Sequence, residues 1–356
     1  MGSGLERHVG GEFARVVAAL NEHVAPVMAL DVPTGIHGDT GAVLGCAVRA
    51  DLTVTFVGLK AGLFLGEAPD YRGELRFAGL DIPDDYRRGI APVYRRINDD
   101  MLASALPRRP RSGHKGDFGH VLVIGGGEGM PGAVRLAGEA ALRTGAGLVS
   151  IATHPSHAAL MVASRPELMP HGVASAADLE PLLERADVIA FGPGLGGSDW
   201  ARQLFEKVAA LEFPAVWDAD ALNLLSESPG VSANRVITPH PGEAGRLLGT
   251  SAADVQADRP AALAALQQRY GGTVVLKGAG SLVTAEPVPF LCTAGNPGMG
   301  SPGMGDVLTG IIAALLGQGL DVPTAAAIGV EVHARAGDRA AAAGERGLIA
   351  SDLLDA

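Results

Sequence analysis

An aspartate that follows a glycine-rich stretch and precedes an apolar helix pattern is well placed to do chemistry. The stretch GNPGMGSPGMGD ends at Asp306, and apolar residues then recur at the spacing of one helix face. We expect Asp306 at or next to the helix N-cap. The N–H groups of a first helical turn can hold an anion, especially behind glycines. The carboxylate is then either a simple cap or a general base beside a bound phosphate.

A lysine between a strand pattern and two glycines gives a second phosphate-binding pattern. VVLKGAGS contains Lys277, and a lysine beside glycine N–H groups can hold phosphate as a point charge. An ordinary hairpin turn is the alternative. Lys60 and Lys115 also lie close to glycines, so three of the four lysines are placed as ligand contacts would be.

Two glycine-rich turns follow other strand patterns. GEGMPG (residues 127–132) matches G-x-G-x-x-G, but the next strand ends without the acid that a dinucleotide fold uses to hold a ribose, and Pro131 lacks an N–H. We interpret it as a tight turn, either near a ligand or simply joining strand to helix. FGPGLGG (residues 191–197) permits close backbone approach, by a planar ligand or within a tight loop.

Carboxylates occur in two further motifs. WDADALN places Asp218 and Asp220 at a strand end, where they could bind Mg²⁺ through water or, more simply, cap the next helix. TPHPGE brackets His240 with two prolines and puts Glu243 at a helix start, where its charge also complements the helix dipole.

The elements that carry these motifs predict an α/β fold with a mainly parallel sheet. From about residue 119, strand patterns alternate with helix patterns, and each strand ends in Gly, Pro, Asp or His. Ligands of open α/β sheets bind beyond the carboxyl ends of the strands. Residues 1–97 show a shorter run of such units, residues 98–112 are typical of a polar linker, and residues 113–356 form the larger domain.

Composition narrows the function. The chain has 356 residues, 47% of them hydrophobic, and a net charge of −11, which argues against general nucleic-acid binding. No apolar run is long enough to span a membrane, and the first residues do not resemble a signal peptide. Two distant cysteines, Cys46 and Cys292, suit a reduced compartment. We expect a cytoplasmic protein that binds neither nucleic acid nor membrane.

The motifs from residue 113 onward occur together in one family. KGDFGHVLVIGG, GMPGAVRLAGEAALRTGAGLV, GPGLG, DADALN, TPHPGEAGRLLG, VLKGAGSLV and GMGDVLTGIIAALL follow in this order. Their combination resembles the ADP/ATP-dependent NAD(P)H-hydrate dehydratases, which have a ribokinase-like α/β/α fold. The resemblance implies that ADP or ATP phosphorylates the ring hydroxyl of hydrated NADH or NADPH, and that loss of phosphate then restores the double bond.

The same resemblance implies roles for individual residues. Asp306 is the catalytic base. Binding of the hydrated cofactor falls to Ala133, Gly194, His240 and Asp306. Nucleotide binding falls to Lys277, Gly278, Ala279, Gly280, Ser281 and Gly305. Mg²⁺ is expected with the nucleotide, near Glu243, and a homo-oligomer is expected. Pro302 stands where the family usually has a glycine, so one potential N–H donor to phosphate is absent.

The first 97 residues resemble the C-terminal part of the NAD(P)H-hydrate epimerase domain. VMALDVPTGIHGDTG, ADLTVTF and DYRGELRFAGLDIP carry this resemblance. It assigns substrate binding to Gly2, Ser3, Gly4, Leu5, Arg7 and Asp31. It also assigns a K⁺ contact to Thr34. The family's catalytic aspartate would stand before Met1, so we expect no epimerase activity.

Two other functions fit part of the pattern. TPHPGEA resembles a motif of hydroxymethylpyrimidine kinases, which are also ribokinase-like and use a base in a G-x-G-D motif. Such a kinase would leave a stable phosphorylated product, whereas the dehydratase releases phosphate. A nucleotide-binding module without catalysis is the other alternative.

Overall fold

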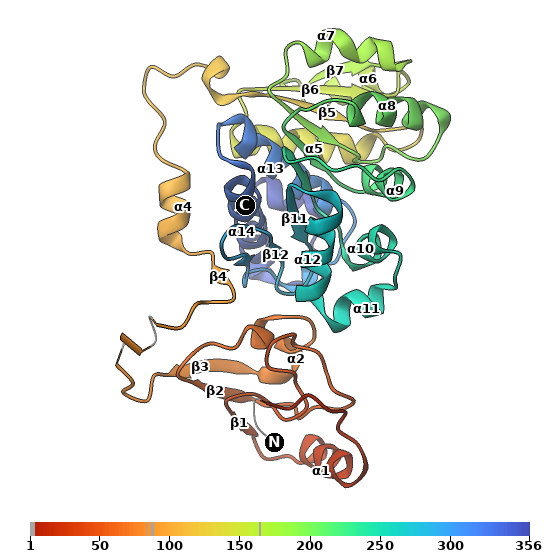
Figure 1. Ribbon diagram of the computed structural model, residues 1–356. Coiled ribbons are helices and arrows are strands. Elements are labelled where there is room, and N and C mark those ends of the chain that lie inside the picture. Colours follow the sequence, from red (N-terminus) through yellow and green to blue (C-terminus); the bar gives the residue numbers. More distant parts are fainter. Residues whose placement is uncertain (1–3, 84, 87–88, 164) are drawn as a thin grey trace.

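The strands of this protein form two separate sheets. The computed structural model describes residues 4–83, 85–86, 89–163 and 165–356. Within these ranges, a ten-stranded sheet belongs to the larger domain and a three-stranded sheet to the N-terminal half (Figure 1).

The large sheet is mainly parallel, as the sequence predicts. Its strand order is β4-β13-β12-β11-β10-β9-β8-β5-β6-β7, and only β12 is antiparallel to its neighbours. Apolar runs such as residues 121–124 form strands buried on both faces, which is usual where helices cover a parallel sheet. The strands are β4 (Arg95–Arg96), β5 (His120–Ile124), β6 (Leu148–Thr153), β7 (Met169–Gly172), β8 (Val188–Phe191), β9 (Ala215–Trp217), β10 (Arg235–Ile237), β11 (Thr273–Leu276), β12 (Leu282–Val283) and β13 (Phe290–Leu291).

Helices cover both faces of this sheet. Along β5, Val121 and Val123 enter one apolar layer, whereas Leu122 and Ile124 enter the other, because successive side chains of a strand point to opposite faces. The first layer lies under α5 (Pro131–Thr144), α13 (Met304–Gly317) and α14 (Val322–Ala340). The second lies under α8 (Asp199–Ala209), α9 (Asp220–Glu227), α10 (Pro241–Leu248) and α12 (Arg259–Tyr270). The predicted α/β/α architecture is confirmed.

Shorter helical segments connect these elements. The α-helical ones are α4 (Asp99–Ala105), α6 (Ala158–Val162), α7 (Glu180–Leu183) and α11 (Ala252–Ala257). The 3-10 turns are η2 (Lys115–Phe118), η3 (Ala176–Leu179), η4 (Pro297–Met299), η5 (Ala341–Ala343) and η6 (Ala350–Leu354).

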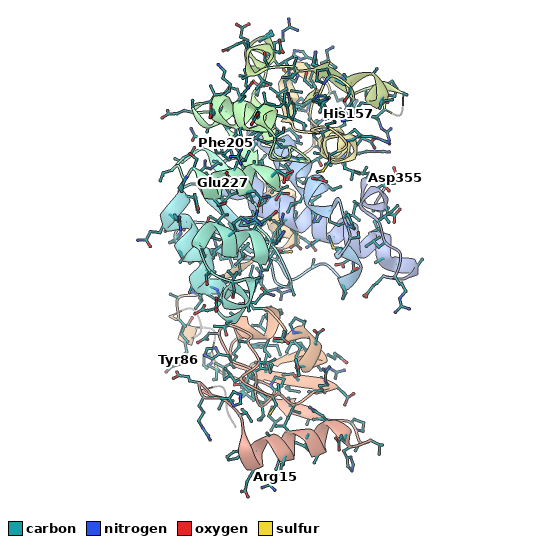
Figure 2. All side chains as sticks on the ribbon, turned by 90° about the vertical axis from the view of Figure 1, so that its right-hand side faces the viewer. Arg15, Tyr86, His157, Phe205, Glu227 and Asp355 are labelled. Atoms are coloured by element: carbon teal, nitrogen blue, oxygen red, sulfur yellow. The ribbon has the colours of Figure 1, made fainter. Side chains whose placement is uncertain are left out.

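The N-terminal half has a small parallel sheet in the order β1-β2-β3. Its elements are α1 (Gly11–Glu22), β1 (Met28–Leu30), β2 (Leu52–Phe56), η1 (Ala61–Phe64), α2 (Pro69–Arg72) and β3 (Glu74–Ala78). Helix α1, on which Arg15 is labelled in Figure 2, lies at the end of the molecule remote from the large sheet. Met28 and Leu30 on β1 and Val16 on α1 remain exposed, so the apolar residues of this half are only partly covered.

The segment that connects the two parts of the chain packs on the larger domain and is not a loose linker. β4 precedes residue 98, yet it pairs in parallel with β13 of the large sheet. The segment expected as a linker, residues 98–112, begins with α4. Asn98 caps this helix by accepting the Met101 N–H at 3.0 Å, and Arg335 of α14 lies 2.5 Å from Asp99. The chain therefore packs on the larger domain as it enters it.

Helix α13 is the most apolar helix of the core and packs closely on α5. Gly310 makes this approach possible, because an added Cβ there would lie 2.0 Å from the Ala137 carbonyl oxygen. Although α13 is apolar, neither it nor any other helix in the described ranges is long and apolar enough to cross a bilayer. The α5–α13 contact fixes the helix that carries Asp306.

Gly310→Ala should lower the free energy of unfolding by about 1–3 kcal/mol, because overpacking outweighs the better helix propensity of alanine. Gly317→Ala is the matched control in the last turn of the same helix, where the nearest atom to an added Cβ is 3.6 Å away. It should leave stability unchanged or raise it by up to about 1 kcal/mol. Denaturant unfolding of both variants measures the difference, and equal effects would contradict the close contact.

Candidate active site

The predicted chemical residues meet at the carboxyl edge of the large sheet. Asp218 follows β9, Glu243 lies in the first turn of α10, Lys277 follows β11, and Asp306 lies in α13. The Lys277 Nζ atom is 2.6 Å from Asp218 Oδ1 and 3.8 Å from Glu243 Oε2. Side chains far apart in the sequence thus surround one ammonium group.

Asp306 is not the cap of its helix. Helix α13 begins at Met304, and its N-cap is Gly303, whose φ of 90° puts it in the left-handed region without a side-chain cap bond. Asp306 is therefore the third residue of the helix, which corrects the expectation that it lies at or next to the N-cap. Within the described part of the chain, no hydrogen bond reaches its carboxylate. A capping carboxylate would accept an N–H of its own helix, so the capping alternative is excluded.

Two acids of this cluster have raised pKa values. Burial, with the like charge of Asp218, raises the pKa of Asp306 from 3.8 to about 7, although Lys277 attracts the charged form. Burial also raises the pKa of Glu243 to about 7, again against the pull of Lys277. Burial opposes the charge of Lys277, but the carboxylates of Asp218, Glu243 and Asp306 raise its pKa overall. Acids poised near neutral pH beside a fixed cation suit proton transfer.

Gly305 brings the start of α13 against this ion pair. An added Cβ at Gly305 would lie 2.8 Å from Asp218 Oδ2 and 3.2 Å from Lys277 Nζ. A side chain at this position would push the helix away from the two groups. The absence of one lets the first-turn backbone of α13 face the same space as the lysine, which is the arrangement expected of an anion site.

Neither acid of the DAD motif caps the next helix with its side chain, in contrast to the expectation for one of them. Asp218 is 2% exposed and accepts a hydrogen bond from Thr309 Oγ1 at 3.2 Å in addition to its pair with Lys277. Asp220 accepts the Gly196 N–H at 2.8 Å, which fixes the glycine loop after β8. Ala219 between them has a φ of 51°. This uncommon conformation turns the two carboxylates to different partners.

The two glycine turns pack on each other. The Gly127 N–H donates to the Gly194 carbonyl at 2.7 Å. An added Cβ at Gly194 would lie 3.0 Å from the Ala133 Cβ and 2.9 Å from the Met130 carbonyl oxygen. The structure thus brings Ala133 and Gly194 together, beyond β5 and β8 at the same edge of the sheet as Asp218.

His240 has a structural role that the sequence did not show. Its Nδ1 accepts the backbone N–H groups of Gly242 and Glu243, while Glu243 accepts the His240 N–H, so the two form a capping box for α10. Burial, with the charge of Lys277, lowers the pKa of His240. The neutral ring therefore carries its proton on Nε2, which lies 3.5 Å from Glu243 Oε1.

Arg259 supports the predicted nucleotide loop, a role that the sequence analysis did not predict. It is fully buried and donates to the carbonyls of Leu276 at 3.1 Å, Lys277 at 3.2 Å and Gly280 at 3.2 Å. Burial lowers its pKa to about 10, so it remains charged at neutral pH. An arginine at a helix start is usually a surface residue, and only tertiary packing shows this contact.

His333 supports the start of α13 from the neighbouring helix α14. Its ring is buried beside the backbone of Met304, which favours the protonated form, but burial outweighs this and lowers the pKa of His333 to about 4. The ring is therefore neutral at neutral pH. His333 of α14 thus lies against the first residue of α13, and no motif in the sequence indicates this.

The predicted substrate residues of the N-terminal half are only partly brought together. Gly2 and Ser3 lie outside the described residues. Gly4 is exposed, Leu5 is buried, and the Arg7 guanidinium lies 5.5 Å from the ring centre of Phe13 on α1. In the described ranges, no hydrogen bond joins these three residues to Asp31.

Asp31 itself is held by its neighbours at the end of β1. It accepts hydrogen bonds from Lys60 at 2.5 Å, Thr55 at 3.1 Å and the Phe56 N–H at 3.2 Å. Burial alone would raise its pKa, but these donors lower it. Thr34, the predicted K⁺ contact, lies three residues further on, and its carbonyl accepts the Val48 N–H. Lys60 is thus placed near a carboxylate rather than toward the larger domain's site.

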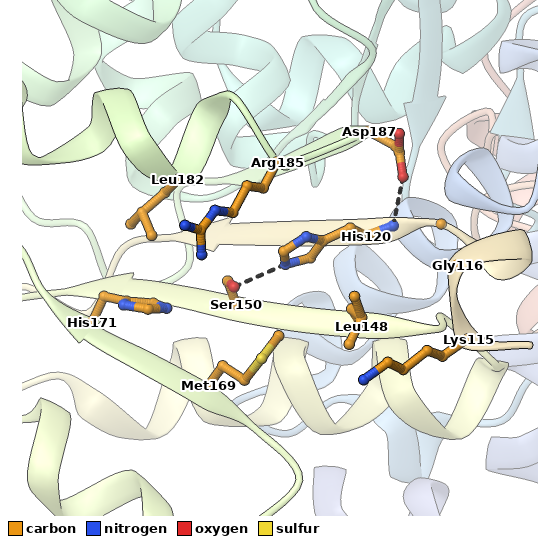
Figure 3. A pocket seen from close by; sticks show the side chains of 11 residues that line it. Lys115, Gly116, His120, Leu148, Ser150, Met169, His171, Leu182, Arg185 and Asp187 are labelled. Atoms are coloured by element: carbon orange, nitrogen blue, oxygen red, sulfur yellow. Dashed lines mark hydrogen bonds between the residues drawn. The ribbon is translucent and has the colours of Figure 1, made fainter.

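A separate cavity lies at the amino ends of the strands, away from these residues (Figure 3). It has a volume of about 590 Å³, and His120, Ser150, His171 and Arg185 line it together with Lys115. Asp187 accepts the His120 N–H at 2.8 Å at its rim. Lys115, expected as a ligand contact, therefore lies at this cavity and not at the site of Asp306.

A parallel sheet whose carboxyl edge joins glycine turns, a lysine and a buried acid at a helix start defines the ribokinase-like class of phosphoryl-transfer folds. A ribokinase-like protein of Enterococcus faecalis superposes with a TM-score of 0.70 at 31% identity, over 75% of this chain and 94% of that one. The chain belongs to the NAD(P)H-hydrate dehydratase family, whose profile matches residues 121–356. A profile described as YjeF-related protein N-terminus matches residues 1–62.

Two relatives agree with this assignment. The bifunctional NAD(P)H-hydrate repair enzyme of Coxiella burnetii is 50% identical over 99% of this chain and 73% of its own length. The ADP/ATP-dependent NAD(P)H-hydrate dehydratase of Bacillus subtilis, crystallised with ATP and Mg²⁺, is 29% identical, with a TM-score of 0.67 over 74% of this chain and 96% of that one. The chain is thus an ADP/ATP-dependent hydro-lyase of this family, which confirms the resemblance and favours it over the kinase alternative.

Asp306→Asn should stabilise the protein while it removes the carboxylate. The folded-state pKa of Asp306 lies above 3.8, so between about pH 4 and 7 the folded protein binds more protons than the unfolded chain, and this contribution to stability is lost as pH rises. At pH 8 the variant should gain roughly 1–2 kcal/mol, and at pH 4 close to none. Thermal unfolding at both pH values measures this, and an equal or lower stability at pH 8 would show that the carboxylate is not destabilised.

Proposed function

We propose that Asp306 is the general base that activates the ring hydroxyl of the hydrated cofactor, and that the phosphate donor lies between Lys277 and Gly305. The main support is the Asp306 carboxylate in the first turn of α13, which does not cap its helix and whose pKa is raised to about 7. A carboxylate with this pKa can take a proton at neutral pH and release it again. The neighbouring ammonium and helix N–H groups supply the positive environment for the transferred phosphoryl group.

The remaining predicted residues fit binding roles around this centre. We assign the loop of residues 277–281 and Gly305 to the nucleotide. We assign Ala133, Gly194 and the Nε2–H of His240 to the hydrated cofactor. Supporting this, the start of α5, which carries Ala133, packs against Gly194 at the strand ends, and His240 is the N-cap of α10 beside Glu243.

The proposed reaction has two stages. The hydroxyl oxygen of the hydrated ring attacks the terminal phosphorus of ADP or ATP and its proton passes to Asp306, while the bond to the nucleotide breaks. The ring phosphate then leaves with the C–O electron pair, and loss of a proton from the adjacent ring carbon restores the double bond. Fixed positive groups at the developing charge account for the lowered barrier of the first stage.

Mg²⁺ fits this site as a companion of the nucleotide. In the ranges that the structure describes, no three His, Cys, Asp or Glu side chains come together as a metal site. Mg²⁺ commonly uses one or two carboxylates together with substrate phosphates and water. Glu243, next to Lys277, would hold the ion through its carboxylate oxygens. When bound, the ion neutralises phosphate charge.

The N-terminal half supports a second, separate ligand role. We infer that Asp31 contacts a hydrated nucleotide there, because its lowered pKa keeps it ionised, and that K⁺ contacts the hydroxyl of Thr34. We further propose residues 1–97 and 113–356 as the two functional parts, a homo-oligomeric assembly and a cytoplasmic location. The absence of epimerase activity stays a prediction.

Pro302 removes one N–H group that could bind the phosphate. It lies before Gly303, the N-cap of α13, and lacks the N–H of the glycine that the family usually has there. Gly303, Gly305 and the first helical turn still supply donors. We infer that the missing donor weakens nucleotide binding rather than the proton transfer, because Asp306 lies on the other side of the cap.

Asp306→Asn should lower turnover by about 10²–10⁴-fold while nucleotide affinity changes little, because the amide has the same shape and cannot accept the proton. Recovery of the dihydronicotinamide absorbance measures turnover, and calorimetry with ADP measures affinity. Asp321→Asn is the matched control, since Asp321 caps α14 by accepting the Thr324 N–H at 3.0 Å and asparagine caps equally well. Wild-type turnover in Asp306→Asn would reject the proposed base.

The pH profile should report the same carboxylate. At saturating nucleotide, kcat/KM for the hydrated cofactor should rise with pH and level off above about 7, since only ionised Asp306 accepts a proton. Asp218→Asn removes the like charge and leaves Lys277 free to favour ionised Asp306, so the rise should move to lower pH by about one unit.

Glu243→Gln separates the two acids that titrate near neutral pH. If Asp306 is the base, this variant has a lower rate but keeps the pH dependence of the wild type. If Glu243 is the base, the rise with pH disappears.

A further inference from the structure

One segment of the N-terminal half is buried against the larger domain. Leu63 and Leu65 are 0% exposed, and Phe64 is nearly so. They belong to the same apolar layer as Leu276 and Leu282, the strand residues on either side of the nucleotide loop. Leu63 and Phe64 belong to η1, which follows β2, and Leu65 is the C-cap of η1. A turn of the small domain thus completes the core of the large one.

This segment touches the nucleotide loop itself. An added Cβ at Gly280 would lie 2.2 Å from the Phe64 carbonyl oxygen and 3.0 Å from Leu65 Cδ2. The carbonyl of Gly280 accepts a hydrogen bond from Arg259 at 3.2 Å. Gly280 is therefore held between a buried arginine of the large domain and the backbone of the small one.

The segment is fixed at both ends. Before it, Lys60 bonds Asp31 at 2.5 Å and the Phe56 carbonyl at 2.7 Å. At Phe64, the guanidinium of Arg96 lies 5.3 Å from the ring centre, and the same side chain donates to Thr293 Oγ1 at 3.0 Å. Because Arg96 belongs to β4, which pairs with β13, it joins the segment to the edge of the large sheet.

The nucleotide loop needs such support. Gly278 and Gly280 have φ values of 137° and 68°, and the loop joins two strands. Glycines lose more conformational freedom on ordering than any other residue. A surface that orders the loop before the ligand arrives therefore raises affinity, since less entropy is lost on binding.

We propose that the N-terminal half is a positioning element of the dehydratase, in which Phe64 and Leu65 hold the loop of residues 278–281 in its nucleotide-binding conformation. This rests on the proposed role of that loop. The small domain thus contributes to the reaction of the large one without contacting the reacting atoms.

Leu65→Ala in the full chain tests this role. It should raise the KM for ADP about tenfold and weaken ADP binding in calorimetry to the same extent, while kcat at saturating ADP changes by less than about threefold. Leu65→Met should restore most of the affinity, because it refills the same volume. Phe64→Leu, which removes the ring beside Arg96, should raise the KM for ADP in the same direction.

Val17→Ala is the matched control. Val17 is a 4% exposed residue of the small domain whose apolar cluster contains Leu5, Val9 and Val48 and lies apart from the nucleotide loop. This variant should lower thermal stability but leave the KM for ADP unchanged. The proposal is overturned if Leu65→Ala and Phe64→Leu leave ADP affinity at the wild-type value, or if Val17→Ala weakens it equally. Absence of ADP binding by the wild type would instead overturn the proposed function.

Discussion

The ion pair between Lys277 and Asp218 is the interaction on which the site depends. Both groups are taken out of water, which is costly for each charge, and the cost is offset only where geometry and further hydrogen bonds are favourable. Here the two atoms are 2.6 Å apart, and Thr309 donates to the second carboxylate oxygen. The pair joins the ends of β9 and β11 to α13, and removal of Lys277 would leave the buried carboxylate of Asp218 without its cation.

The same pair explains why an acid nearby can act as a base. A single ammonium serves three carboxylates, so its attraction is shared, and burial of Asp306 and Glu243 is not fully compensated. Their pKa values rise to about 7 as a result. The site is thus held in a destabilised, reactive state by a core that is stable elsewhere. Gly305 and Gly310 matter because they let α13 approach the ion pair and α5 closely enough for this.

Residues without chemistry of their own hold the reactive groups in place. Arg259 bonds three carbonyls around the nucleotide loop, and His333 is buried beside the first residue of α13. Asp220 fixes the glycine loop after β8. Arg259 and Asp220 each bond the backbone of a turn, so these loops at the strand ends gain the rigidity of the core. The small domain contributes to this support through the turn that contains Phe64.

The class of fold and the turns that carry the site could be predicted from the residues alone. Apolar runs bounded by glycine, proline and aspartate are local patterns, and they suffice to predict a parallel sheet with ligand-binding turns at one edge. The order of the motifs around Lys277 and Asp306 also determined the family, since it depends only on residue types and spacing.

The roles of the individual polar residues became visible only in the folded protein. The sequence left Asp306 as a cap or a base, assigned capping to the DAD motif and gave no sign of Arg259 or His333. These roles depend on burial and on distances between groups that are 59 residues apart, as for Lys277 and Asp218, or more. A local pattern carries no information on such distances, whereas the electrostatic cost of burial and the partners that offset it are set by packing alone.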